Sequence, residues 1–415
     1  MAVRQPVWLR RAAVPGAEAF ALLFALESLT RAVLTALLPL EAFRILGTAQ
    51  AVSTLFFLGS ISGLCGSFLV PWLVRHSSRR LVYSLGVLLL ISATAAFALG
   101  TTEDAPVWLV AGLACRVLGV VTLTICLNLY IMDVIAKHDL SRSEPMRMFY
   151  SAAAWIGGPT LGIWLAQAAS PLASYLLSFL AGAALLAFFW YLRLVDPPSI
   201  AVVPGRRRAP GPLANIGRYA AQPRLATAWI VALGRYSWWA MFYIYMPIYA
   251  VKSGLGEATA GLLISLANLG ILAAPLWGRA IRRLGCRAML VFGFGLSALA
   301  TTGTALLYDL PELAAGLLVL AALGMIVIDS VGNTLFFTAV RRRERAQMTA
   351  VYATYRDAGD LVTPGSFSLL LRFFELPVVF FCSGVAMLAL ALLCRRVNPR
   401  IGVAARTAPV AATGE

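Results

Sequence analysis

Twelve long apolar runs alternate with short hydrophilic connections along this chain of 415 residues. A helix needs about 20 mainly apolar residues to cross the hydrocarbon core of a bilayer. The pattern therefore predicts an all-α membrane protein with twelve transmembrane helices. The predicted spans are residues 18–43, 49–73, 81–100, 106–132, 148–168, 172–194, 225–251, 257–280, 287–308, 312–339, 347–371 and 376–394.

Basic residues lie in every second connection. Of the 34 lysines and arginines, 27 lie in the two terminal segments and in the connections after spans 2, 4, 6, 8 and 10. Three lie on the opposite side, and four lie within spans. Because basic connections are retained in the cytoplasm, we expect a multi-pass protein of the cell inner membrane with both termini in the cytoplasm.

Composition supports the membrane interpretation. The chain is 60% apolar and 13% charged, with a mean hydropathy of +0.82, whereas soluble domains contain about 25% charged residues. The net charge of +16 is explained by the cytoplasmic connections, so we expect no nucleic-acid partner. The six cysteines form no CxxC pair, and the two histidines lie in predicted loops, which excludes a histidine proton relay within the membrane. We expect no bound metal.

The longest connection divides the chain into two halves of six spans each. Residues 195–224 are rich in proline, glycine and arginine and are interpreted as a cytoplasmic linker, the alternative being merely a long loop. The predicted domains are residues 1–194, a six-helix bundle, and residues 225–415, a second bundle with a cytoplasmic tail. A basic segment after span 2 also recurs after span 8, as expected for a duplicated transporter.

These two basic segments, residues 71–80 and 278–287, resemble the signature loop of the major facilitator superfamily, G-x-L-a-D-R-x-G-R-R. The first copy keeps Leu73. Both copies have arginine where the motif has aspartate, so that Asp133 in span 4 is a candidate for the missing acid. The resemblance implies two pseudo-symmetric bundles around a central cavity lined by spans 1, 4, 7 and 10. The gating-loop candidates are Arg75, Arg79, Arg80, Asp133, Gly278, Arg282, Arg283, Gly285 and Arg287.

Two further segments match the same family. Arg116-Val117-Leu118-Gly119 in span 4 is similar to its R-x-x-x-G region, with the glycine one residue closer to the arginine. In span 5, Gly158, Pro159 and Gly162 belong to a segment that resembles the motif of drug:proton antiporters. That second resemblance implies export of a small organic molecule in exchange for protons.

Charged residues inside the spans are the principal functional candidates. A charge at the centre of a membrane helix costs about 2.5–3.5 kcal/mol, so each should face water or a partner. Glu27 and Arg31 share one helix face, as do Arg356 and Asp360, and each pair is either a structural ion pair or part of a coupling mechanism. The proton-coupling candidates are Glu27, Asp329, Asp357 and Asp360, with Glu27 preferred because it lies mid-span.

The remaining polar and aromatic residues of the spans are substrate-cavity candidates. Arg116 and Arg235 have no opposite charge within one turn, so each either holds an anionic substrate group or pairs with a carboxylate across the bundle. The aromatic residues of span 7 either stack on a ligand or pack against neighbouring helices. The complete candidate set is Arg31, Arg116, Asn128, Arg235, Trp238, Trp239, Tyr243, Asn333 and Arg356.

No phosphate-binding G-x-x-x-x-G-K-[ST] loop, HExxH motif or nucleophile elbow occurs in the sequence. We therefore expect a non-enzymatic secondary transporter that uses no cofactor and no ATP, with protons, a small-molecule substrate and the lipid bilayer as partners. Proton-coupled export is the preferred interpretation. Proton-coupled import of an organic anion is one alternative, and a non-transporting receptor or assembly component with a transporter fold is another.

Overall fold

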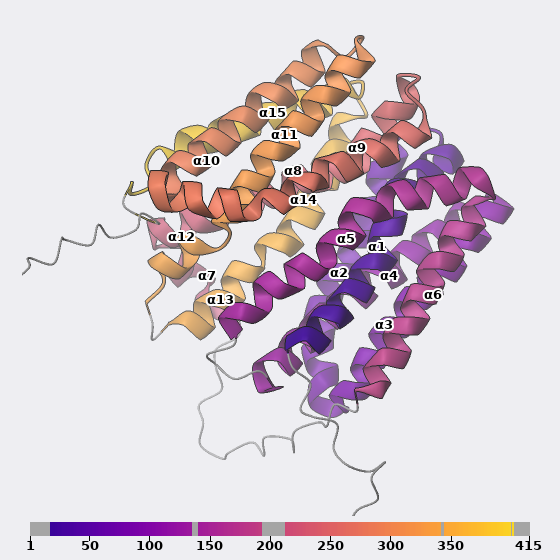
Figure 1. Ribbon diagram of the computed structural model, residues 1–415, viewed down its shortest axis with the longest axis horizontal. Helices are drawn as coiled ribbons and strands as arrows, with labels where there is room; N and C mark the ends of the chain where they lie inside the picture. Colours follow the sequence, from indigo (N-terminus) through magenta and orange to yellow (C-terminus); the bar gives the residue numbers. More distant parts are fainter. Residues whose placement is uncertain (1–16, 135–139, 193–211, 342–343, 400, 402–415) are drawn as a thin grey trace, which may run out of the picture. The chain divides into compact units, whose positions relative to one another are not determined.

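The computed structural model describes residues 17–134, 140–192, 212–341, 344–399 and 401, and all regular secondary structure within them is helical (Figure 1). The all-α fold class is therefore confirmed. The first six helices follow one another with connections of a few residues. They are α1 (Ala17–Leu46), α2 (Ala49–His76), α3 (Arg79–Glu103), α4 (Pro106–Val134), α5 (Leu140–Ala168) and α6 (Pro171–Tyr191).

The second part of the chain begins with a short helix that precedes the long ones. Its elements are α7 (Pro212–Ala220), α8 (Pro223–Lys252), α9 (Glu257–Leu269), the 3₁₀ turn η2 (Gly270–Ala273), α10 (Ala274–Leu306), α11 (Pro311–Val331), α12 (Thr334–Ala339), α13 (Arg345–Ala353), α14 (Tyr355–Leu370) and α15 (Pro377–Cys394). Within the described residues, eight helices are long and apolar enough to cross a membrane on their own.

Some of the predicted spans are interrupted or differ in their limits, and glycine accounts for two of the differences. Predicted spans 8 and 9 meet within α10, where Gly285 has φ 82° and ψ 161° and turns the chain. Predicted span 10 is divided into α11 and α12 at Gly332, which has φ 55°. Glycine adopts a positive φ readily because it has no Cβ atom. Predicted span 5 starts too late, because α5 already begins at Leu140.

Residue contacts group the chain into two compact units, which we call unit 1 and unit 2. Unit 1 comprises residues 1–208, 240–268 and 360–376, and unit 2 comprises residues 209–239, 269–359 and 377–415. This grouping places parts of α8, α9 and α14 with the first six helices, and the predicted division into residues 1–194 and 225–415 stays a prediction. Which helices move together during function stays a prediction.

Close backbone packing joins α1 and α5, which lie side by side in Figure 1. A Cβ atom on Gly158 would lie 2.7 Å from the Cβ of Ala32, and one on Gly162 would overlap the carbonyl oxygen of Val33. Glycine at these two positions lets the helix axes approach, as small residues do in many membrane bundles. The span 5 motif thus has a packing role within unit 1.

Unit 2 contains a similar contact between α10 and α11. A Cβ atom on Gly293 would lie 2.7 Å from the carbonyl oxygen of Gly324, and the Ser297 hydroxyl donates to the Ala321 carbonyl at 2.8 Å. The helix α15 also packs on α10. A side chain-to-backbone hydrogen bond inside a bundle satisfies both polar groups away from water.

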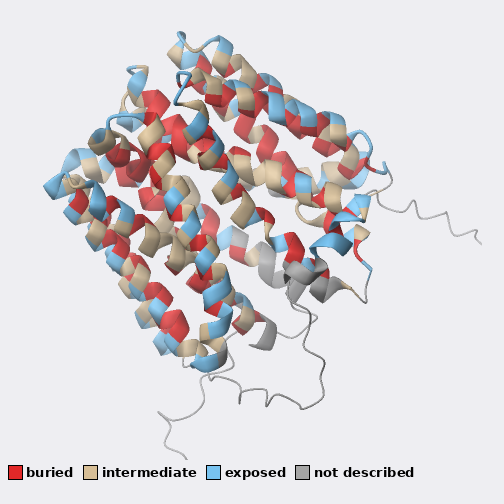
Figure 2. Ribbon diagram, turned by 180° about the vertical axis from the view of Figure 1, so that it is seen from behind, coloured by how far each residue is buried: buried red, intermediate tan, exposed pale blue. Residues whose placement is uncertain are grey.

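Large apolar side chains remain exposed along the helix surfaces, interspersed with buried positions (Figure 2). Leu299, Leu306 and Phe373 are each more than 70% exposed. A water-soluble surface rarely exposes so many large apolar side chains, whereas lipid solvates them. The exposure pattern therefore agrees with a membrane protein.

Candidate functional site

Among the described residues of unit 1, the Glu27 carboxylate is the most deeply buried acidic group. It lies in the middle of α1 with 1% of its side chain exposed, and its Oε1 lies 3.5 Å from Nη1 of Arg31, one turn later, which is 29% exposed. Within the described residues, neither carboxylate oxygen accepts a hydrogen bond. The ion pair is consequently long and asymmetric, with the acid inside the bundle and the base nearer its surface.

Arg147 is a second basic group close to Glu27, and the sequence reasoning missed it. We counted Arg147 as a loop residue, but α5 begins at Leu140, which places Arg147 within the helix and leaves it 8% exposed. Its guanidinium lies 4.4 Å from the ring of Phe24, donates to Oδ1 of Asn128 at 3.4 Å and interacts electrostatically with Glu27. Because the apolar run starts only at residue 148, the predicted span left out the polar first turns of the helix.

Arg116 lies in α4 and is directed toward α1. Its Nη2 donates to the backbone carbonyl of Arg31 at 3.1 Å. Within the described part of the chain, no carboxylate lies within ion-pair distance of Arg116. Pairing of Arg116 with a carboxylate across the bundle, one of the two alternatives expected from the sequence, is therefore not observed among these residues.

Arg235 differs from Arg116 because it has an acidic partner across unit 2. Nε of Arg235 in α8 lies 3.3 Å from Oδ1 of Asp329 in α11, and the indole nitrogen of Trp239 donates to Oδ2 at 2.9 Å. The Arg235 side chain is 14% exposed and the Asp329 side chain is 41% exposed. The carboxylate is thus held by two donors yet remains open on one side.

The Tyr355 hydroxyl connects two arginines in the same unit. It accepts from Nη2 of Arg235 at 3.4 Å and from Nε of Arg356 at 3.2 Å. The two guanidinium carbons lie 6.0 Å and 5.7 Å from the Tyr355 ring, within the range of a cation–π interaction. One tyrosine, a residue that the sequence analysis did not select, therefore positions two of the candidate arginines.

The Asn333 side chain, at the break between α11 and α12, belongs to the same region. Its Oδ1 accepts from the Tyr352 hydroxyl at 2.9 Å, and the Tyr352 ring stacks on Phe336 at 4.3 Å. Asn333 is therefore occupied by a neighbouring tyrosine at the point where the helix changes direction.

The aromatic residues of predicted span 7 have different environments. Trp238 is buried and its indole nitrogen donates to Thr301 at 2.9 Å, which indicates a packing role. Tyr243 donates to Oδ1 of Asn268 at 3.2 Å, and its ring lies 5.9 Å from that of Trp155 within unit 1. Trp239 donates to a charged group, the carboxylate of Asp329.

Unit 1 also contains four hydrogen bonds made by uncharged hydroxyl groups, which we call the hydroxyl contacts of unit 1. They involve α2 and α5 on one side and parts of α8, α9 and α14 on the other. The contacts are Ser53 Oγ with Tyr245 Oη at 2.7 Å, Thr54 Oγ1 with Ser368 Oγ at 2.7 Å, Thr160 Oγ1 with Ser265 Oγ at 2.7 Å, and Ser60 Oγ with the Asp360 carbonyl at 2.6 Å.

Asp360 thus contributes its backbone carbonyl to the hydroxyl contacts of unit 1. The limit between the two units falls just before Asp360, so that Asp360 is grouped with unit 1 while Arg356 and Asp357 are grouped with unit 2. The proposed roles of Asp357 and Asp360 in proton coupling stay predictions.

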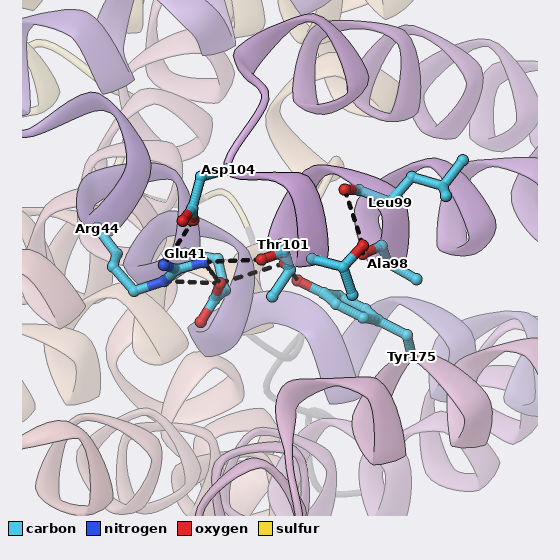
Figure 3. A network of polar contacts seen from close by, with 8 residues as sticks. Glu41, Arg44, Ala98, Leu99, Thr101, Asp104 and Tyr175 are labelled. Carbon is cyan, nitrogen blue, oxygen red and sulfur yellow. Dashed lines mark hydrogen bonds and ion pairs between the residues drawn. The ribbon is translucent and has the colours of Figure 1, made fainter.

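A charged network closes the end of unit 1 where α1 meets the α3–α4 turn (Figure 3). Arg44 lies 3.0 Å from Oε2 of Glu41 and 2.8 Å from Oδ1 of Asp104. Thr101 donates to Glu41 at 3.2 Å and shares a 2.9 Å hydrogen bond with Tyr175. The network ties α1, α3 and α6 together through one arginine shared by two carboxylates, which indicates a structural role.

The structure places the two gating-loop copies differently in their local geometry. Arg79 and Arg80 form the first turn of α3 after the Ser78 cap, whereas Gly278, Arg282 and Arg283 lie in the first part of α10, before the Gly285 turn and Arg287. The side chains of Arg75 and Asp133 lie outside the described residues, so the proposed substitution of one acid by the other stays a prediction.

Comparisons with known proteins identify the family. The model of the Major Facilitator Superfamily matches residues 20–364 and 254–410. The chain belongs to the major facilitator superfamily. It is a membrane protein with a transporter fold, as the resemblance of its loop motifs implied. Among curated proteins, none matches the sequence.

Solved structures of this superfamily share the fold. A POT family transporter in complex with 5-aminolevulinic acid has a TM-score of 0.74 at 12% identity, covering 91% of this chain and 94% of the other. A D-xylose-proton symporter has a TM-score of 0.72 at 11% identity, covering 93% and 97%. The nucleoside transporter NupG has a TM-score of 0.69 at 12% identity, covering 91% and 98%. At such identities the likeness concerns the fold alone.

Proposed function

We propose that this superfamily member is a proton-coupled secondary transporter of a small organic molecule. The cell inner membrane, with both chain termini in the cytoplasm, is its proposed location. The observation that carries the proposal is Glu27, a mid-helix carboxylate that is 1% exposed and has an arginine at 3.5 Å as its ion-pair partner. Intramembrane acids of this kind are rare and are commonly found in proton relays.

The chemistry of coupling follows from the exchange of partners around Glu27. A carboxylate that faces an arginine in one conformation and loses that contact in another binds a proton in the second conformation and releases it in the first. Arg31 and Arg147 provide two basic partners on different helices, α1 and α5. A relative shift of these helices would change the electrostatic environment of Glu27 without any new residue entering the site.

The direction of transport needs evidence other than the span 5 motif. Gly158 and Gly162 are accounted for by the close approach of α5 to α1, which does not distinguish an exporter from an importer. The solved neighbours include a proton symporter. Export in exchange for protons and proton-coupled import therefore both remain within the proposal, and flux measurements in the two orientations separate them.

Import of an organic anion is favoured by one specific observation. Arg235 and Arg356 converge on the hydroxyl of Tyr355, and the Asp329 carboxylate that faces Arg235 is partly exposed. Two guanidinium groups held in this way match the geometry of a carboxylate or phosphonate group. A substrate anion would compete with Asp329 for Arg235.

The test is a flux measurement in proteoliposomes with and without an imposed pH gradient. A thermal-shift screen first identifies a ligand among 5-aminolevulinic acid, short peptides, D-xylose and nucleosides, which are the classes bound or carried by the solved neighbours. We expect the gradient to drive accumulation by the wild type. Glu27→Gln should lose gradient-driven accumulation while retaining ligand binding, whereas Glu18→Gln, at the exposed start of the same helix, should behave as the wild type.

Two results would contradict the proposal. Gradient-driven accumulation by Glu27→Gln at the wild-type rate would exclude Glu27 as the proton carrier. Binding of a ligand without any flux, in protein shown to be folded, would favour a receptor or assembly component with a transporter fold.

A further inference from the structure

A small cavity lies within unit 1 among residues of α1, α3, α4 and α6. Its lining includes the side chains of Arg31 and Arg116 and the hydroxyl-bearing residues Thr30, Thr94 and Ser178. The remaining lining residues are apolar. The cavity has space for about one water molecule or one ion of similar size.

Among the described residues, Arg116 brings a positive charge to this cavity without an acidic partner. Its one hydrogen bond there goes to the backbone carbonyl of Arg31. The charged group of the described chain that acts on it electrostatically is Arg31, which has the same sign. A guanidinium carries five N–H donors, and removing an unbalanced charge from water costs several kcal/mol. A negative group from outside the chain would supply the missing acceptor and the missing charge.

The hydroxyl groups do not provide this balance. Thr30 donates to the Glu27 carbonyl at 2.6 Å, Thr94 to the Ile91 carbonyl at 2.7 Å, and Ser178 to the Thr30 carbonyl at 2.8 Å. Each hydroxyl has one hydrogen, so these three protons are already engaged with the backbone. The donors left for a ligand are the N–H groups of the two arginines.

We propose that this cavity is a binding site for a small monovalent anion, held by the guanidinium groups of Arg116 and Arg31. A halide ion and the carboxylate of a small organic acid share this chemistry, since both present one negative charge to N–H donors. A sulfate ion is too large for the space and carries a second charge. The site lies among helices of unit 1 and differs from the Arg235–Asp329 site of unit 2.

The anion site would communicate with the coupling pair through Arg31. Arg31 lines the cavity and is also the ion-pair partner of Glu27. An anion bound beside Arg31 therefore competes with Glu27 for the same guanidinium. This competition matters for coupling only if the proposed function is correct. Binding of the anion does not depend on the proposed function. A binding assay can therefore succeed even if the protein shows no transport.

The experiment measures thermal unfolding of the purified full-length protein at constant ionic strength. Sodium chloride and sodium formate are compared with gluconate and sulfate, which serve as references that do not fit. We expect chloride or formate to raise the midpoint by several degrees at saturation. Arg116→Gln should abolish this anion dependence and should unfold in gluconate at a temperature no lower than the wild type, because a charge without a partner has been removed.

Matched controls separate a site from a general salt effect. Arg372→Gln changes an exposed arginine and should keep the anion-dependent shift of the wild type. Stabilisation by chloride but not by formate would identify a free inorganic ion, and stabilisation by formate would identify the carboxylate of an organic acid. An equal shift in the wild type and in Arg116→Gln, or no shift in the wild type, would overturn the proposal.

A second measurement keeps the test decisive if Arg116→Gln does not fold. Trp155 lies 5.6 Å from the Arg31 guanidinium, so chloride or formate bound at the site should change its fluorescence in a saturable manner. The change should be absent in Trp155→Phe and should be half-complete at the same anion concentration as the thermal shift. A change that rises linearly with concentration, without saturation, would show a general salt effect and no site.

Discussion

The indole nitrogen of Trp239 donates to Oδ2 of Asp329 at 2.9 Å, on the oxygen opposite to the one that Arg235 approaches. Trp239 and Arg235 are one helical turn apart on α8, so one face of this helix supplies both donors. The arrangement fixes the rotamer of Asp329 while leaving 41% of its side chain exposed. A carboxylate held in this manner is oriented toward whatever enters the open side.

Loss of the Trp239 donor should weaken this arrangement. Trp239→Phe keeps an aromatic ring but removes the hydrogen bond, and we expect a loss of about 1 kcal/mol in stability. Asp329→Asn should cost about 1–2 kcal/mol, reduced from the value for a fully buried pair because Asp329 is partly exposed. The double variant Arg235→Gln with Asp329→Asn should recover part of the stability lost in Asp329→Asn. Chemical unfolding in detergent measures the stability of Trp239→Phe, Asp329→Asn and the double variant. Strictly additive single effects would show that the pair is not coupled.

Arg147 and Glu27 should be coupled energetically across α5 and α1. Because the Arg147 guanidinium acts on Glu27 electrostatically, each single substitution to glutamine leaves the other charge less well balanced. We expect a coupling energy of roughly 0.5–3 kcal/mol between Arg147→Gln and Glu27→Gln in a double-mutant cycle. Arg218→Gln with Glu27→Gln provides the control, since Arg218 lies in α7 and pairs with Glu344 at 2.8 Å. A coupling energy near zero for the first pair would place Arg147 outside the electrostatic environment of Glu27.

Two neighbouring glycines of α5 should respond in opposite ways to the same substitution. Gly162→Ala would bring a methyl group against the Val33 carbonyl and should destabilise the protein by about 1–3 kcal/mol. Gly157→Ala has no atom within 4 Å of the new Cβ and should be neutral or stabilising by up to about 1 kcal/mol, because alanine favours a helix. Thermal unfolding compares the two variants directly. A similar loss at both positions would indicate a general requirement for flexibility in α5, not close packing.

The hydroxyl contacts of unit 1 should allow a specific disulfide. The side-chain oxygens of Thr54 and Ser368 are 2.7 Å apart, which is compatible with the short Cβ–Cβ distance of a disulfide. The double variant Thr54→Cys with Ser368→Cys, made in a background with Cys65→Ser, should form the cross-link on mild oxidation and lose transport until it is reduced.

Either single cysteine variant should transport normally under the same oxidation. Because the contacts are neutral hydroxyl pairs worth about 1 kcal/mol each, they are weak enough to break during a transport cycle. Full transport by the cross-linked protein would exclude a requirement for separating α2 from α14.

The twelve apolar runs, the alternation of basic connections and the charges within the runs are local properties that the sequence alone determines. A span needs only about 20 consecutive apolar residues, and an i, i+4 pair such as Glu27 and Arg31 follows from the helical repeat. The family was also recognisable, because short loop motifs keep their spacing even when individual residues change.

The tertiary structure decided which partner each charge has. Arg116 and Arg235 are alike in sequence, since neither has an acid within one turn, yet Arg235 meets Asp329 from another helix while Arg116 meets a backbone carbonyl. Arg147 was assigned to a loop because hydropathy reports polarity and not helical continuity. Partners in α1, α4, α5, α8 and α11 are set by helix packing over large sequence separations, so the polar contacts emerge only once the helices are packed together.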